Sequence, residues 1–452
     1  MSRYLLKNAT IVTGSSCARG GLGIDGDRIA GIWYQDDCPF PEADVINLGG
    51  KLLMAGMIDP HVHFREPGLT WKACIESESR AALLGGVTSF IDMPNTSPPT
   101  VSKQALEEKL SIGASSSYSN YGFHLGATNG NAGAIKEYLD EGLGCKFAGI
   151  KVFMGSSTGN MLVDREEALK DFFQIKGKPI LVHCEDEGMI RANLESAKQA
   201  FGNDIPFSYH PMIRSREACI KSTAKALEMA VKYGTALHVL HVSTAEEVEM
   251  IREAKTRNPY ISSETSANYL WFCDEDYPRL QGLLKCNPSV KTRADREALR
   301  RGLADETIDI LASDHAPHLL SEKGRSYPDC PSGVPSAGQT LSVAITIAQE
   351  YGIPYQRIAG ACSEKTAELF GVVDRGNLKA GCFADLVVID PDKESEVCAN
   401  YKCGWSPYDG TRLKGKVEMV WLNGLPVVTG GSNVCAGKGQ FQPQPLQFRP
   451  IG

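Results

Sequence analysis

Short apolar runs alternate with amphipathic stretches through the centre of the chain. The apolar runs, such as VTSFIDM and PILVHCE, are rich in β-branched residues, which is typical of buried strands. The stretches between them, such as REEALKDFFQIKG, repeat apolar residues at helical spacing. Strand candidates lie at residues 56–64, 87–93, 121–128, 147–154, 179–185, 236–243, 260–267 and 308–315. Eight strands that alternate with helices predict an α/β fold, a (β/α)8 barrel of the TIM type.

The two ends of the chain follow a different rhythm. Residues 1–53 and 375–452 read as short strands that are separated by Gly-, Asp- and Pro-containing turns. We expect these two segments to form one small β-sandwich domain beside a barrel at residues 54–374. The segment 319–338 is rich in Pro, Gly and Ser and follows the eighth strand, so it predicts a loop over the barrel mouth.

Composition excludes several classes of protein. The chain has 452 residues, of which 42% are hydrophobic and 22% charged, as in globular enzymes rather than disordered proteins. A net charge of −7 gives no basic footprint for nucleic acid. The chain has no apolar run long enough for a membrane span and no signal-peptide pattern at its start. The 14 Cys form no CxxC pair, so we expect reduced thiols and a cytoplasmic protein.

Candidate metal ligands recur where the predicted strands end. His61 and His63 have the two-residue spacing that places both rings on one face of a strand, which in a barrel is the interior. Each histidine alone fits a buried structural role equally well. Further ligand-type side chains stand at or near the ends of four other predicted strands: Lys151, His183, His241 and Asp314. Core packing does not predict this coincidence, so the set indicates a metal site at the barrel mouth.

Lys151 is chemically out of place in such a set. An ammonium group repels a cation, and a salt-bridged structural lysine is the ordinary alternative. A lysine amine that reacts with carbon dioxide becomes a carbamate, which is anionic and offers two oxygens. Lys151 fits the set if it is modified in this way.

These residues lie in motifs that resemble a known family. The motifs, in order, are GMIDPHVHFREPG, GVTSFIDMPNT, GIKVFMGSSTG, LVHCEDE, HVLHVST and ASDHAPH. Their order resembles the amidohydrolase superfamily. The HVHFREPG and DMPNT motifs resemble the dihydroorotases, which are related to hydantoinases and allantoinases. The resemblance covers nearly the whole chain.

The resemblance implies a centre of two zinc ions per subunit. His61, His63 and Asp314 would bind one ion, and His183 and His241 the other. Lys151, as N6-carboxylysine formed with carbon dioxide, would bridge them together with a hydroxide. Asp314 would be the catalytic residue that moves a proton while the hydroxide opens a cyclic amide.

The resemblance also implies a substrate and the residues that hold it. The reaction would interconvert (S)-dihydroorotate and N-carbamoyl-L-aspartate in pyrimidine biosynthesis. Arg65, Asn95 and His318 would hold the exocyclic carboxylate, and Asn287 would contact the ring. A salt bridge for Arg65 and a turn role for Asn95 are the structural alternatives. The segment CNPSVKT departs from many dihydroorotases, which have arginine at the position of Lys291.

Three other functions share parts of this pattern. Allantoinases and hydantoinases, the latter also called dihydropyrimidinases, would use the same metal residues, but Arg65 and Asn95 favour an anionic substrate. A non-catalytic scaffold of the same fold would lose ligands, whereas every expected ligand position is occupied here. We expect a small-molecule substrate, no nucleic-acid or membrane partner, and a homo-oligomer, either a dimer or a tetramer.

Overall fold

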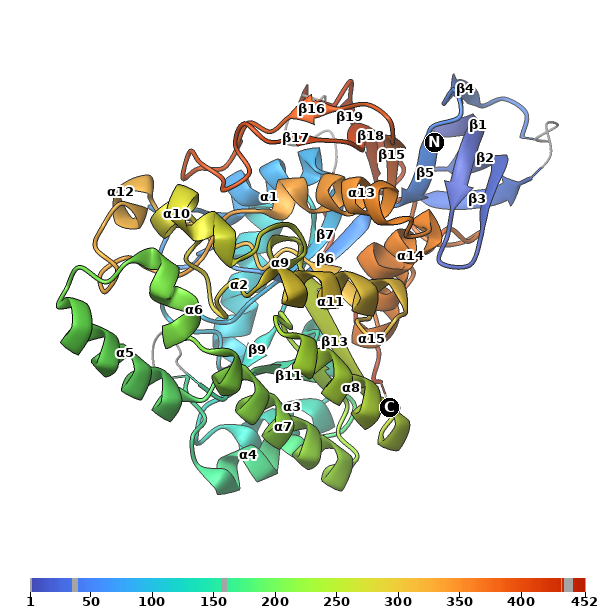
Figure 1. Cartoon of the computed structure of the whole chain (residues 1–452). Helices are drawn as coiled ribbons and strands as arrows, with labels where there is room; N and C mark the ends of the chain where they lie inside the picture. The colour runs from blue at the N-terminus through green and yellow to red at the C-terminus, as the bar shows by residue number, and fades with distance from the viewer. Residues whose placement is uncertain (1, 35–39, 156–160, 432, 435–441, 452) are drawn as a thin grey trace.

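The computed structural model describes residues 2–34, 40–155, 161–431, 433–434 and 442–451. Its centre is a closed barrel of parallel strands surrounded by helices (Figure 1). The barrel strands are β6 (Met57–Val62), β7 (Val87–Asp92), β8 (Asn120–Phe123), β9 (Leu125–Gly126), β10 (Ile150–Phe153), β11 (Ile180–His183), β12 (Leu237–Val239), β13 (Ile261–Ser266) and β14 (Ile310–Ala312).

The barrel consists of two hydrogen-bonded sheets that meet at two places. Strands β6, β7 and β8 form one hydrogen-bonded sheet, and β9 to β14 form a second. Only His124 separates β8 from β9, so these two pieces together make the predicted third strand. On the other side, Val62 pairs in parallel with His315, just beyond β14. The predicted (β/α)8 barrel is therefore confirmed.

The connecting helices begin at residues that satisfy their free backbone N–H groups. The side chains of Ser215 and Thr244 accept hydrogen bonds from N–H groups in the first turns of their helices, and Glu247 completes a capping box with Thr244. The main barrel helices are α1 (Ile75–Leu84), α2 (Lys103–Ser116), α3 (Ala132–Asp140), α4 (Glu166–Phe173), α7 (Arg216–Tyr233), α8 (Ala245–Arg257), α11 (Arg293–Ala304) and α13 (Thr340–Tyr351).

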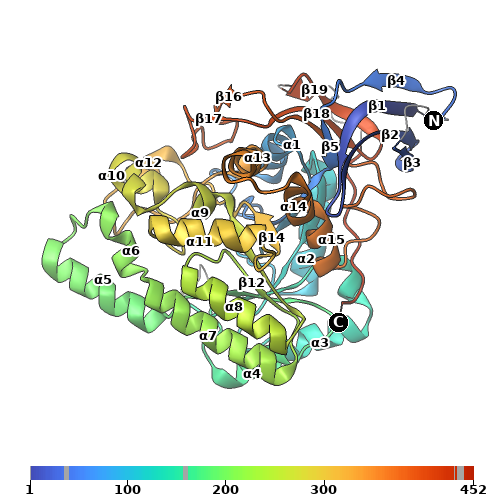
Figure 2. The same ribbon diagram turned by 45° about the vertical axis from the view of Figure 1, so that its right-hand side comes forward.

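Further helices lie between these elements. They are α5 (Glu187–Phe201), α6 (His210–Ile213), α9 (Ala267–Trp271), α10 (Tyr277–Leu280), α12 (Leu320–Lys323), α14 (Tyr355–Ala359) and α15 (Lys365–Phe370). Figures 1 and 2 show α5, α6 and α12 at one end of the molecule, with α15 and the C-terminal end of the chain on the opposite side. Among the described residues, no helix is long and apolar enough to cross a membrane.

Both chain ends contribute to one β domain. Strand β5 joins them, because it pairs with β1 on one side and with β15 on the other. The resulting sheet has the strand order β20-β19-β18-β15-β5-β1-β2-β3, and β4 also pairs with β1. Its strands are β1 (Arg3–Val12), β2 (Cys17–Asp25), β3 (Arg28–Trp33), β4 (Asp44–Asn47), β5 (Leu52–Ala55), β15 (Leu386–Asp390), β18 (Lys416–Leu422), β19 (Leu425–Thr429) and β20 (Asn433–Val434). A two-stranded sheet of β16 (Ser395–Glu396) and β17 (Arg412–Leu413) lies apart from it.

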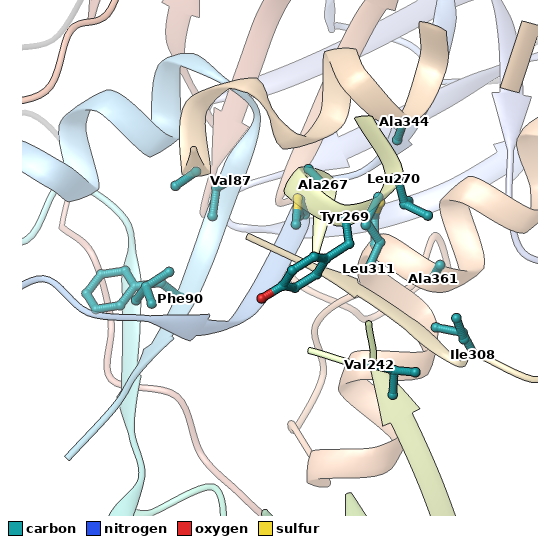
Figure 3. Packing of buried hydrophobic residues seen from close by; sticks show 14 of the residues in the cluster. Val87, Phe90, Val242, Ala267, Tyr269, Leu270, Ile308, Leu311, Ala344 and Ala361 are labelled. Carbon is teal, nitrogen blue, oxygen red and sulfur yellow. The ribbon is translucent and has the colours of Figure 1, made fainter. Parts of the chain in front are cut away.

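The β domain has a hydrophobic core of its own, which includes Leu22, Leu53 and Trp421. A larger core lies between the barrel wall and its helices. Figure 3 shows part of it, where Ala344 of α13 lies near Leu270 of α9 and Leu311 belongs to β14. The chain passes from β5 directly into β6, so we propose that the domain boundary lies close to the expected residue 54.

A buried polar network fastens the β domain to the barrel. The Arg375 guanidinium donates to Asp385, to Asn423 and to Gln444 of the C-terminal segment. Asp385 also accepts a hydrogen bond from Asn120 of β8 at 3.1 Å. Arg375 and Asp385 are each only 4% exposed, so removing one charge would leave the other buried and unpaired.

We expect Arg375→Met to lower the free energy of unfolding by about 3–5 kcal/mol, because it strands the buried Asp385 carboxylate. Urea or guanidinium denaturation would measure the change. Arg252→Met is the control, because Arg252 pairs with Glu249 and Asp305 at the surface and its loss should cost at most about 1 kcal/mol. Equal losses in the two variants would contradict the structural role of this network.

Candidate active site

The C-terminal ends of the barrel strands converge on a cavity of about 290 Å³. Its walls include every residue that the sequence predicted for the site: His61, His63, Arg65, Asn95, Lys151, His183, His241, Asn287, Asp314 and His318. Phe153, Ala316, Pro331, Ser332 and Gly333 complete the lining. The last three belong to the segment 319–338, so the predicted loop does contribute to this cavity.

Two histidines and a carboxylate form a compact group at the cavity floor. Asp314 Oδ1 lies 3.2 Å from His61 Nε2 and 3.4 Å from His63 Nε2. One potential ligand atom from each of the three side chains lies within 4.8 Å of the corresponding atoms of the other two. This spacing suits a single metal ion. Burial opposes the ionisation of Asp314, but the neighbouring His61 and His63 outweigh it and lower its pKa.

A second histidine pair adjoins this group. His183 Nδ1 lies 2.9 Å from His241 Nε2, and the His61 and His241 rings have centroids 5.4 Å apart. Nδ1 of His241 is buried and has no hydrogen-bond partner within the described part of the chain. Burial, followed by the charges of neighbouring groups, holds the pKa of His241 well below its ordinary value. Burial also lowers the pKa of His183. Both shifts favour the neutral ring, the state in which imidazole binds metals.

Acceptors behind the rings fix their orientation. The Nδ1–H of His61 donates to Glu264 on β13 at 2.5 Å, and that of His63 donates to Asn95 at 2.7 Å. Glu185 accepts from His183 at 2.9 Å and pairs with Arg214. Such outer partners set the tautomer of a ligating histidine and raise its basicity.

Lys151 lies among these groups without a salt bridge. Its Nζ is 4.6 Å from the centre of the Phe153 ring, and the residue is 1% exposed. None of the ion pairs among the described residues involves it, so the sequence alternative of a salt-bridged lysine is absent there. Burial lowers its pKa to about 8, so an appreciable fraction of the amine is neutral near physiological pH.

Three residues of the site hold unusual backbone conformations. Arg65, His241 and Asp314 have positive φ angles of 68°, 37° and 50°. Such angles cost side-chain-bearing residues free energy and cluster where function constrains the backbone. Each of these residues lies two or three positions beyond the end of a barrel strand, and each lines the cavity.

Arg65 occupies the wall beside the histidines. Its Nε donates to the carbonyl of Pro317 at 3.0 Å, and no carboxylate within the described ranges forms a salt bridge with it. Glu66 and Asp59, the partners of the structural alternative, are engaged elsewhere. Glu66 accepts from the backbone of Ile75, and Asp59 accepts from the backbone N–H of His61. Burial lowers the pKa of Arg65 to about 10, which leaves it charged.

Two residues of the CNPSVKT segment, Asn287 and Lys291, differ in their relation to the cavity. Asn287 lines the cavity, and its Oδ1 is buried without a partner in the described chain. Lys291 points away, because its Nζ donates to Ser289 at 3.0 Å and 2.8 Å. The position that departs from the dihydroorotase pattern therefore does not line the cavity.

Sequence analysis missed Glu264, Glu185 and Lys72. Glu264 is a carboxylate in the middle of a predicted barrel strand, and Glu185 stands two residues after His183, so both carried a signal in the sequence. Lys72 donates to His318 at 2.9 Å, and nothing in its sequence surroundings marks that contact.

The remaining buried histidines and Cys184 do not line the cavity. His238 forms hydrogen bonds with Ser262 and Glu264 through its two ring nitrogens, and His315 forms one with Glu78. His124 and His210 contact backbone carbonyls. Burial raises the pKa of the Cys184 thiol to about 12, which makes it a poor nucleophile.

Comparisons with known proteins place this chain in a family. The model of the amidohydrolase family matches residues 52–427, which is most of the chain. The chain belongs to the amidohydrolase family. It is therefore a hydrolase of a generally metal-dependent family that acts on small molecules, and it carries the His61, His63 and Asp314 group expected for a metal.

Proteins similar to this amidohydrolase include a dihydroorotase, an allantoinase and a hydantoinase. A dihydroorotase of Methanosarcina mazei is 34% identical over 420 residues, which cover 88% of this chain and 90% of the relative. An allantoinase of Deinococcus radiodurans is 30% identical over 97% of this chain and 98% of its own. The solved structure of L-hydantoinase (dihydropyrimidinase) from Arthrobacter aurescens superposes with a TM-score of 0.92, at 27% identity, over 99% of this chain and 100% of that chain.

We expect Glu264→Gln to weaken divalent-metal binding by roughly 10–100-fold, because it removes the carboxylate that orients His61. Titration of metal-free protein against a competing chelator measures the affinity. Glu78→Gln is the matched control, because Glu78 pairs with His315 at 2.8 Å outside the cavity and should leave the affinity unchanged. Equal weakening in both variants would show a general effect of losing a buried charge.

Proposed function

We propose that this chain is a zinc-dependent dihydroorotase, which interconverts (S)-dihydroorotate and N-carbamoyl-L-aspartate in pyrimidine biosynthesis. The observation that carries the proposal is Arg65, a buried guanidinium on the cavity wall that has no salt bridge to any described carboxylate. An uncompensated buried cation is costly unless a ligand supplies the negative charge. A location in the cytoplasm and assembly into a homo-oligomer stay predictions.

The substrate that completes this arrangement carries an anionic group. Dihydroorotate has an exocyclic carboxylate, whereas hydantoin, dihydrouracil and allantoin are uncharged rings. A guanidinium recognises a carboxylate through two parallel hydrogen bonds, and such charge-assisted bonds are strong in a dry cavity. Asn95 and His318, which line the same cavity, complete the proposed carboxylate site.

The donor set fits two zinc ions. We assign His61, His63 and Asp314 to one ion, and His183 and His241, whose Nδ1 has no described partner, to the other. When bound, two zinc ions lower the pKa of a shared water and polarise the carbonyl of the cyclic amide.

Lys151 completes this set as a carbamate. Its neutral amine would attack the carbon of carbon dioxide, so that an N–C bond forms as one C=O π bond opens. The nitrogen would then release one proton to solvent, which leaves an anionic group with two oxygens. This anion would replace the buried and unpaired ammonium of the free lysine. Burial favours the neutral amine and therefore the reaction.

Asp314 is the proposed proton carrier. Its pKa is lowered, so it is a carboxylate at neutral pH and can accept a proton from the attacking water. It then donates this proton to the ring nitrogen as the amide bond breaks. The same steps in reverse close the ring of carbamoyl aspartate.

Ring opening of four substrates by the zinc-loaded protein tests the proposed function: dihydroorotate, dihydrouracil, hydantoin and allantoin. We expect dihydroorotate to be preferred, and Arg65→Met to lower its kcat/KM by about 100-fold or more while zinc content is kept. Arg279→Met, at the exposed Arg279–Asp276 pair, is the control. Preference for allantoin or for an uncharged ring would assign the chain to the function of its other relatives, and inactivity on all four would favour the scaffold.

Lys151→Ala tests the bridging role. We expect it to lose at least one of the two zinc ions and nearly all activity, measured by elemental analysis and ring opening. Lys178→Met is the control, since Lys178 is a buried lysine outside the cavity. Zinc reloading without carbon dioxide should also fail, and full zinc with full activity in Lys151→Ala would refute the carbamate.

A further inference from the structure

The His318 ring has a fixed partner at each nitrogen. Lys72 Nζ lies 2.9 Å from Nδ1, and the Ser332 carbonyl lies 3.0 Å from Nε2. An ammonium group can only donate and a carbonyl can only accept. A neutral ring with its proton on Nε2 and its lone pair on Nδ1 satisfies both partners, and the opposite tautomer satisfies neither.

Neither partner is free to move away. Lys72 Nζ forms a 2.9 Å salt bridge with Glu322, and both side chains are largely buried. The Ser332 carbonyl stands between those of Pro331 and Gly333, and both of these accept hydrogen bonds of 2.9 Å from Lys323 Nζ.

Gly333 and Trp405 bring the loop and the His318 backbone together. A Cβ at Gly333 would lie 2.5 Å from the Ala316 carbonyl and 3.1 Å from the His318 ring, so only glycine allows this approach. The Trp405 indole N–H donates to the His318 carbonyl at 2.7 Å. The loop therefore packs closely against His318, and Trp405 anchors the His318 backbone.

The tautomer decides what Arg65 can bind. Arg65 Nη2 lies 3.1 Å from His318 Nε2. With a proton on Nε2, both atoms are donors and no hydrogen bond joins them. The His318 N–H then donates to the Ser332 carbonyl, and Arg65 Nη2 keeps its N–H for an acceptor in the cavity. With a lone pair on Nε2, His318 would accept from Arg65 and satisfy this N–H internally.

We propose that Lys72, held by Glu322, is a positioning residue that fixes the Nε2–H tautomer of His318, so that Arg65 keeps its Nη2 N–H for the carboxylate of the substrate. This inference rests on the proposed function for the identity of the carboxylate. Lys72 does not line the cavity and acts only through His318. Glu322 neutralises the Lys72 charge, which leaves Arg65 as the cation that the substrate meets.

The neutral state of His318 agrees with its surroundings. Burial, together with the positive charges of Arg65 and Lys72, holds the pKa of His318 well below its ordinary value. A protonated ring would place a third cation between them. The ring therefore stays neutral, and the choice between its two tautomers is the property that Lys72 controls.

Steady-state kinetics of the zinc-loaded Lys72→Met variant is the first test. We expect the KM for dihydroorotate to rise by about tenfold or more with kcat within about threefold of the parent, because substrate binding loses a donor while the metal ligands stay intact. Lys72→Arg should retain KM within about threefold, since it also donates. Lys365→Met, at the exposed Lys365–Glu368 pair, is the matched control. An unchanged KM in Lys72→Met would overturn the proposal.

The tautomer itself is the second readout, measured by nitrogen NMR of histidine-labelled protein, with His318→Ala to assign the signals. We expect His318 to be protonated on Nε2 in the parent and in Lys365→Met, and to shift towards Nδ1–H in Lys72→Met. This readout needs no substrate. A protein that shows the shift but does not open dihydroorotate would refute the proposed function alone. An active protein without the shift would refute the role of Lys72 alone.

Discussion

Burial of the Arg65 guanidinium beside a cluster of histidines is the constraint around which this site is arranged. The side chain is 7% exposed and meets a backbone carbonyl rather than a carboxylate. Nearby carboxylates are committed elsewhere: Asp314 faces the histidines and Glu322 holds Lys72. The cavity therefore keeps one positive charge for a ligand, and a ligand that lacks an anionic group leaves this charge unpaired in a medium where that is costly.

The barrel supplies the rigidity that this arrangement needs. Side chains from six strand ends reach one cavity, and buried acceptors such as Glu264 brace the rings from across the barrel. The positive φ angles of Arg65, His241 and Asp314 show that the backbone is held in costly conformations at the points where it turns into the site. The surrounding core and the network at Arg375 stabilise a frame that can maintain them.

Much of this could be predicted from sequence because it follows from local periodicity. Ligand-type residues at strand ends share one end of a barrel once the strands are parallel, so His61 and Lys151 were found together without knowledge of any contact. The joining of both termini at β5 was predicted in outline, but not the strand order. Lys72 was not predicted, because its contacts with His318 and Glu322 join segments about 250 residues apart, and periodicity carries no information about such contacts.

The central claim is that the cavity selects its substrate by an anionic group. Ring closure of N-carbamoyl-L-aspartate, compared with N-carbamoyl-β-alanine, tests it most directly, because the two compounds differ only by the carboxylate that Arg65 is proposed to bind. We expect the zinc-loaded protein to close carbamoyl aspartate at least about 100-fold more efficiently, because carbamoyl-β-alanine lacks the charge-assisted bidentate contact. Equal efficiency with both compounds, or preference for carbamoyl-β-alanine, would contradict it.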